Sequence, residues 1–197
     1  MQLFLDVDGV LLNFERAFVR WLNSAYGMEL PADYQTTCWY FSEIMEREQA
    51  QARWESFMES PLASQMPPLV EPGHFNHLTR HHEVHLLTNF PASQMDKRRN
   101  NLESIGLKYH SLHYGGLHHN DGHHPPTKGE LVRELRNPDE PALFMDDHPD
   151  NCLEVSQACP DVEVWLMSRR FNQGFAHPAV RRAVDWGCVM GRLNGAA

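Results

Sequence analysis

The chain begins with MQLFLDVDGV, residues 1–10, a short apolar run that ends in two acidic residues and a glycine. This pattern is typical of a buried strand that carries carboxylates into a cleft. Alternate residues at a strand end can point the same way, so Asp6 and Asp8 could both reach that cleft. Two carboxylates so close together repel, and a cation would keep both ionised. By itself the Asp-Val-Asp-Gly sequence is more often a simple turn. With support from the rest of the chain, it indicates a phosphoryl-transfer site.

The length and composition are those of one compact domain with a small accessory module. The chain has 197 residues, of which 42% are apolar and 22% charged. Lys and Arg total 17 against 26 Asp and Glu, a formal net charge of −9. No broad basic surface is therefore expected for a nucleic-acid polymer, whereas a small anionic substrate could still bind in a cleft.

The cysteines and the hydropathy pattern indicate a cytoplasmic protein with no membrane partner. The four cysteines contain no C-x-x-C pair, so free thiols in a reducing compartment are expected. The chain begins with its first strand, which leaves no room for a signal peptide, and no apolar run reaches membrane-spanning length. The oligomeric state stays open, a homodimer included.

A helical insertion is predicted directly after the first strand. Apolar residues at helical spacing predict an amphipathic helix over 11–25, which Gly27 would end. A connection over 28–40 leads to a second helix, capped by Ser42 and ending near residue 58. We therefore expect a helical cap over residues 13–70 and a core made of residues 1–12 and 71–197.

Strands and helices alternate in the rest of the chain. Strands are expected at 83–88, 111–114, 142–147 and 162–167, and helices at 73–80, 93–105, 128–135 and 149–158. Thr127 and Glu130 have capping-box spacing before the third of these helices. An amphipathic segment over 178–193 closes the chain. The alternation predicts an α/β fold, a Rossmann-like, doubly wound parallel sheet.

Polar residues stand at the ends of three predicted strands. In a parallel sheet all carboxyl ends open on one side, where ligands bind, so residues far apart in sequence would meet there. Asp6 and Asp146 could supply the oxygen ligands that Mg²⁺ prefers. Thr88 could donate a hydrogen bond to a phosphoryl oxygen. Lys128, at a helix start, would add a positive charge and the helix dipole.

Four segments resemble the sequence motifs of the haloacid dehalogenase-like hydrolase superfamily, in the right order over residues 2 to about 167. They are Asp6-Val7-Asp8-Gly9-Val10, Leu87-Thr88-Asn89, Lys128, and Phe144-Met145-Asp146-Asp147-His148-Pro149-Asp150. The resemblance implies a Rossmann-like core, a magnesium site and an aspartyl-phosphate intermediate. It also implies that the cap closes over the site, excludes water and selects the substrate.

The resemblance also implies a role for each matching residue. Asp6 is the nucleophile and a magnesium ligand, and Asp8 the general acid/base, whose backbone carbonyl also binds the metal. Thr88 and Lys128 clamp the phosphoryl group, with Asn89 as a further phosphate-binding residue; Asp146 is a metal ligand. An acid at position 8 suits phosphate-ester hydrolysis, because a leaving alkoxide needs a proton, and disfavours carbon–halogen cleavage. Asp147 and Asp150 could bind a metal-bound water, orient Lys128 or cap the next helix.

Within that superfamily, the chain is most similar to the 5'(3')-deoxyribonucleotidase group. Phe14 follows the acidic loop closely, and Trp39 and Tyr40 lie in a connection, so their rings could stack on a nucleobase. Asn89 with Phe90 after Thr88 departs from the phosphate-loop sequence expected for that group. A (deoxy)nucleoside monophosphate is the expected substrate. A sugar phosphate, and a catalytically silent sensor of a phosphorylated ligand, are the alternatives.

A histidine-rich segment invites a transition-metal interpretation. Its spacing is irregular, and no cysteine or carboxylate pattern completes a site, so a solvated loop is preferred. The histidines concerned are His110, His113, His118, His119, His123 and His124.

Overall fold

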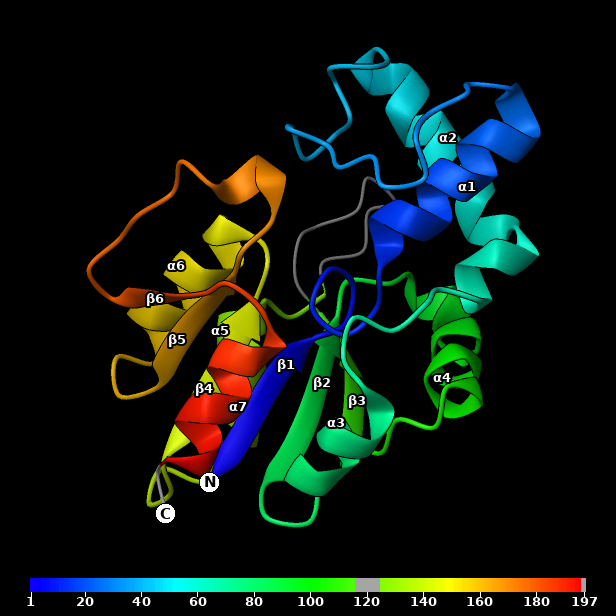
Figure 1. The fold of residues 1–197 in the computed structure, drawn as a ribbon. Coiled ribbons are helices and arrows are strands. Elements are labelled where there is room, and N and C mark those ends of the chain that lie inside the picture. Colours follow the sequence, from blue (N-terminus) through cyan, green and yellow to red (C-terminus); the bar gives the residue numbers. More distant parts are fainter. Residues whose placement is uncertain (116–124, 196–197) are drawn as a thin grey trace.

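A six-stranded parallel sheet forms the centre of the chain, with strand order β3-β2-β1-β4-β5-β6 (Figure 1). The computed structural model describes residues 1–115 and 125–195. The strands are β1 (Gln2–Asp6), β2 (Glu83–Thr88), β3 (Ser111–Tyr114), β4 (Ala142–Asp146), β5 (Glu163–Met167) and β6 (Val180–Ala183). The predicted α/β, doubly wound architecture is therefore confirmed.

Strand β1 lies between β2 and β4 and is buried on both faces of the sheet. Leu5 is level with Leu86 of β2 and with Met145 of β4. Because side chains alternate along a strand, Leu3 and Leu5 pack into one half of the core and Phe4 into the other. This two-sided burial explains why the first strand is a continuous apolar run.

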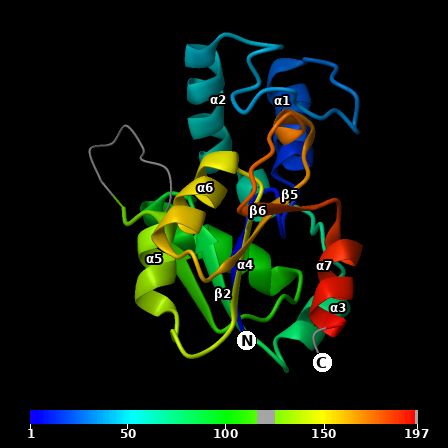
Figure 2. The ribbon, with the colours of Figure 1, turned by 90° about the vertical axis from the view of Figure 1, so that its left-hand side faces the viewer.

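Helices cover both faces of the sheet (Figures 1 and 2). One face packs against α3 (Pro72–Leu78), α4 (Met95–Ser104) and α7 (Trp186–Asn194). The other packs against α5 (Lys128–Leu135) and α6 (Pro149–Ala158). The predicted capping box is present at α5, where Thr127 Oγ1 accepts from Glu130 N at 3.2 Å and Glu130 Oε2 from Thr127 N at 2.9 Å.

Residues 13–70, here called the cap, stand over the carboxyl ends of the strands (Figures 1 and 2). They contain α1 (Phe14–Tyr26), α2 (Arg47–Glu59) and the short 3₁₀ helix η1 (Pro61–Ser64). The two connections to the core run side by side, since Asn13 N donates to Pro67 O at 2.8 Å and Leu69 N to Leu11 O at 2.7 Å. Gly27, with a φ of 62°, ends α1 as predicted.

One sequence-based expectation about elements is wrong. The second cap helix begins at Arg47 and not after Ser42, because Phe41 and Met45 are buried in turns that precede it. The amphipathic segment 178–193 contains the edge strand β6 and most of helix α7. The alternation in β6 is hidden in the sequence by its two exposed arginines, which suit an edge strand.

All four cysteines are free, as predicted. In the described part of the chain, none of the helices has both the length and the apolar character needed to cross a membrane.

Candidate active site

Asp6 and Asp146 are the last residues of the adjacent strands β1 and β4, and Lys128 joins them. The Nζ of this first residue of α5 donates to Asp146 Oδ2 at 2.6 Å and also to Asp6 Oδ1. All three side chains are buried. Asp146 also accepts from His148 N at 2.7 Å and from Asn151 Nδ2 at 3.0 Å. Three of the residues singled out in the sequence thus meet at one point.

Asp147 adds a third buried carboxylate to this centre. One oxygen each from Asp6, Asp146 and Asp147 lie within 4.8 Å of one another. Gly9 makes this approach feasible: it has a φ of +77°, and a Cβ there would lie 1.8 Å from Asp147 Oδ2. Gly9 therefore allows both the turn after β1 and the close approach of the Asp147 carboxylate.

Negative charge exceeds positive charge in this centre. Burial raises the pKa of Asp6 to about 8; Lys128 opposes the rise and Asp146 adds to it. Burial and the negative charges of Asp6 and Asp146 raise the pKa of Asp147. Burial alone would lower the pKa of Lys128, but Asp146 and Asp6 outweigh it and raise that pKa. Three carboxylates against one ammonium leave an excess that a divalent cation would neutralise, and a set of oxygen donors suits Mg²⁺.

Asp8 has a different partner, which the sequence did not reveal. Arg98 NH2 donates to both carboxylate oxygens, at 2.7 Å to Oδ1 and 2.6 Å to Oδ2. The Arg98 side chain is fully buried, whereas that of Asp8 is 27% exposed. Burial raises the pKa of Asp8 and Arg98 opposes this rise. This pair is therefore balanced in charge without any further cation.

A cavity of about 620 Å³ lies between this acidic floor and the cap. Asp6, Asp8, Lys128, Asp146 and Asp147 all line it. Aromatic residues supply much of the remaining wall: Phe14, Phe18, Trp39, Tyr40, Phe41, Trp54, Phe90 and Phe171. The chain thus combines charged groups at the strand ends with an apolar roof, as small-molecule sites commonly do.

The solved structures that align with this chain include haloacid dehalogenase-like hydrolases. The L-2-haloacid dehalogenase from Xanthobacter autotrophicus, with chloropropionic acid covalently bound, aligns with a TM-score of 0.62 and 12% identity, over 100% of this chain and 99% of that chain. The chain has the haloacid dehalogenase-like fold. YfnB from Bacillus subtilis, a candidate hydrolase of that superfamily bound to magnesium, aligns with a TM-score of 0.58 and 16% identity over 98% of both chains. A candidate beta-phosphoglucomutase from Thermotoga maritima aligns with a TM-score of 0.57 and 16% identity over 100% of both chains. No protein-family model and no curated protein matches the chain.

Within this haloacid dehalogenase-like fold, the two candidate phosphate-binding residues at the end of β2 differ in position. Asn89 lines the cavity. Thr88 does not: its side chain is fully buried, and its Oγ1 accepts from Phe90 N at 3.2 Å. The structure therefore brings Asn89 and Lys128, but not Thr88, to the wall of the cavity.

The three aromatic residues singled out in the cap, Phe14, Trp39 and Tyr40, all line the cavity. The Trp39 ring lies edge-on to two rings outside the cap, with its centroid 4.3 Å from that of His148 and 5.2 Å from that of Phe171.

Two residues that line the cavity from outside the cap, Phe171 and Arg169, were not predicted, because they follow β5 in a stretch without a motif. Arg169 NH1 donates to Ser168 O at 2.8 Å and NH2 donates to Gly9 O.

Asp150, His110 and His113 lie outside this centre. Asp150 is exposed, and His148 rather than an aspartate caps α6 by accepting from Asp150 N at 3.3 Å. His110 Nδ1 accepts from Val84 N at 2.9 Å, and His113 Nε2 is 2.7 Å from Ser111 Oγ. His118, His119, His123 and His124 lie outside the described residues.

Proposed function

We propose that this chain is a magnesium-dependent phosphatase that hydrolyses a small phosphate monoester through an aspartyl phosphate on Asp6. One observation carries the proposal. The buried Asp6 carboxylate lines the cavity beneath the cap beside Lys128, Asp146 and Asp147, with Asp8 at the same wall. A carboxylate nucleophile, a fixed ammonium and a nearby acid are what a two-step phosphoryl transfer needs.

The donor set of this centre fits magnesium, which Asp6 and Asp146 would hold, with Asp147 close by. When bound, the ion would offset the excess of carboxylates and polarise the phosphoryl group.

The side chains of the chain itself account for the remaining chemistry. Asp6 forms a bond to phosphorus as the ester P–O bond breaks, and Lys128 offsets negative charge on the phosphoryl oxygens. Asp8 gives a proton to the leaving oxygen; burial raises the pKa of this carboxyl, and Arg98 opposes the rise. In the second step Asp8 takes a proton from water as that water attacks phosphorus, which releases phosphate and restores the Asp6 carboxylate.

The aromatic roof supports a nucleoside monophosphate as substrate. Trp39 and Tyr40 line the cavity, and the Arg47 guanidinium lies over the Tyr40 ring, 4.7 Å from its centre. A nucleobase could stack there. A sugar phosphate is the alternative substrate, and equal or better turnover of sugar phosphates than of nucleotides would contradict the nucleotide assignment.

Phosphate release from a simple aryl phosphate, with and without magnesium, tests the proposal. The wild-type chain should release phosphate only with magnesium, and Asp6→Asn should not. Asp150→Asn is the matched control. It also replaces an acid with its amide, but Asp150 is exposed and lies outside the centre, so the rate should stay unchanged. Halide release from chloropropionic acid, without phosphatase activity, would favour a dehalogenase. Binding of phosphate without either reaction would favour a sensor.

A further inference from the structure

Arg98 occupies an unusual place for a charged residue. It lies on α4, it is fully buried, and its guanidinium reaches across to the acidic loop to contact Asp8. A single nitrogen, NH2, contacts both Asp8 oxygens. These two hydrogen bonds hold the Asp8 carboxylate from the side of α4. The direction in which Asp8 points therefore depends on Arg98.

The surroundings of Arg98 hold its guanidinium in place. The guanidinium carbon lies 4.1 Å from the centre of the Phe90 ring, and NH1 lies 3.5 Å from Met66 Sδ. One turn along α4, Asn101 fixes the helix to the same methionine, accepting from Met66 N at 3.0 Å and donating to Met66 O at 3.1 Å. Arg98 is thus anchored to the connection by which the chain returns from the cap to the core.

A purely structural ion pair would be a poor solution at this position. Burying a guanidinium is costly, and replacing a buried pair with apolar residues is often neutral or stabilising. The carboxylate partner, moreover, is partly exposed and lines the cavity next to Asp6. The arrangement fixes the orientation of a carboxylate that the substrate would meet.

We propose that Arg98 is a positioning residue that holds the Asp8 carboxylate toward the leaving-group oxygen of the substrate. The inference rests on the proposed function, because it assigns Arg98 to the proton transfer by Asp8. Fixed geometry is worth much in such a transfer, since small misplacements of a catalytic group lower rates strongly. Arg98 would act through Asp8 alone, without touching the substrate.

The dependence of the rate on the leaving group tests this role. Arg98→Met should lower kcat on an alkyl phosphate, whose leaving group needs a proton, by roughly 10²-fold. It should lower kcat on an aryl phosphate with a weakly basic leaving group by less than about 10-fold, with KM little changed on both. Asp8→Asn should show the same selectivity, and the double variant should be no slower than Asp8→Asn.

Lys97→Met is the matched control. Lys97 is the neighbouring cation of α4, but its Nζ donates to Met58 O at 2.7 Å and it does not contact Asp8. It should leave both rates unchanged. Equal losses on the two esters in Arg98→Met, or multiplicative losses in the double variant, would show that Arg98 is only structural. If Arg98→Met does not fold, Arg98→Lys allows the same comparison.

A crystal structure of the Arg98→Met variant provides a test independent of activity. The Asp8 carboxylate should leave its present direction; an unchanged Asp8 would overturn the positioning role. A wild-type chain that releases no phosphate from either ester would instead contradict the proposed function, and the structural result on Asp8 would still stand.

Discussion

Asp6, the last residue of β1, and Asp8, two positions later, lie in different electrostatic environments. Asp6 shares a single ammonium, that of Lys128, with Asp146 and lies beside Asp147. Asp8 has the guanidinium of Arg98 to itself. The first environment has too little positive charge and favours a cation, whereas the second is balanced. Two side chains of one type can therefore take different roles, one as nucleophile and metal ligand, the other in proton transfer.

Replacing Asp6 should have the largest effect. Asp6→Asn removes the attacking oxygen, and we expect phosphatase activity to fall by roughly 10⁴-fold or more, because removal of a nucleophile abolishes the covalent route. Rapid quenching with labelled substrate measures both the rate and the phosphoryl group held on the protein. A residual rate close to that of wild type would assign the nucleophile elsewhere.

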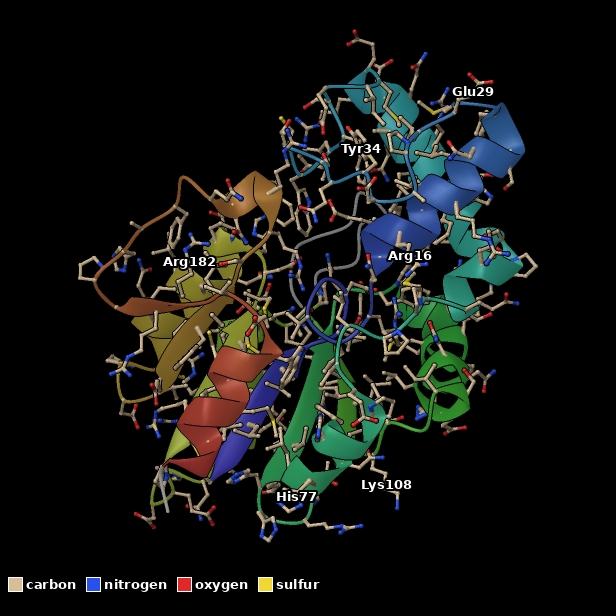
Figure 3. The ribbon with its side chains drawn as sticks, in the orientation of Figure 1. Arg16, Glu29, Tyr34, His77, Lys108 and Arg182 are labelled. Atoms are coloured by element: carbon tan, nitrogen blue, oxygen red, sulfur yellow. The ribbon has the colours of Figure 1, made fainter. Side chains whose placement is uncertain are left out.

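Lys128→Met would break the shared ion pair of the Asp6 environment. We expect kcat to fall by roughly 10³-fold, as one fixed electrostatic group is lost, and the chain to be destabilised by roughly 3 kcal/mol in urea unfolding without metal. Lys108→Met is the control. Lys108 is exposed on the surface of the sheet-containing part of the chain, away from the cap (Figure 3). Wild-type stability of Lys128→Met would contradict the excess of negative charge inferred around Asp6.

The two environments also differ in how much of them could be predicted from sequence. Asp6, Asp146 and Lys128 converge because parallel strands end at one edge and α5 starts there, which periodicity and capping signals indicate. Arg98 was missed because α4 is rich in polar residues and shows no apolar stripe that would mark position 98 as buried. Its partner is 90 residues away in sequence, so only tertiary packing brings the two together. Likewise Thr88 ends a strand as expected, yet its hydroxyl turns to its own loop.

The pH dependence of magnesium binding would sharpen the contrast between the two acids. In the metal-free fold the pKa of Asp6 is raised to about 8 from its ordinary value of 3.8, first by burial. The stability that protonated Asp6 contributes is therefore present below about pH 4 and lost as the pH rises toward about 8. Magnesium competes with that proton, so millimolar magnesium should raise the Tm more at about pH 8.5 than at about pH 6.

Calorimetry measures these Tm shifts, and the Asp8→Asn variant serves as the control that separates the contribution of Asp6 from that of Asp8. This substitution should weaken the pH dependence of the magnesium effect without reversing it, because Asp8 contributes less to the raised pKa of Asp6 than burial and Asp146 do. Equal Tm shifts at both pH values in the wild-type chain would mean that proton release from Asp6 is not linked to the metal.

Trp39→Ala should have the smallest effect, because it changes the roof of the cavity and leaves both acids in place. If a nucleobase stacks on Trp39, KM for a nucleoside monophosphate should rise roughly 10-fold, while kcat and the turnover of a small aryl phosphate stay near wild type. Tyr26→Ala is the matched control: Tyr26 is an aromatic of the cap that is 47% exposed and does not line the cavity. A fall in kcat for both substrates would instead show that the edge contacts of Trp39 with His148 and Phe171 are needed to close the cavity over the acids. Substrate choice and catalysis would then not be divided between cap and floor, and the separate roles of Asp6 and Asp8 would depend on the cap as well.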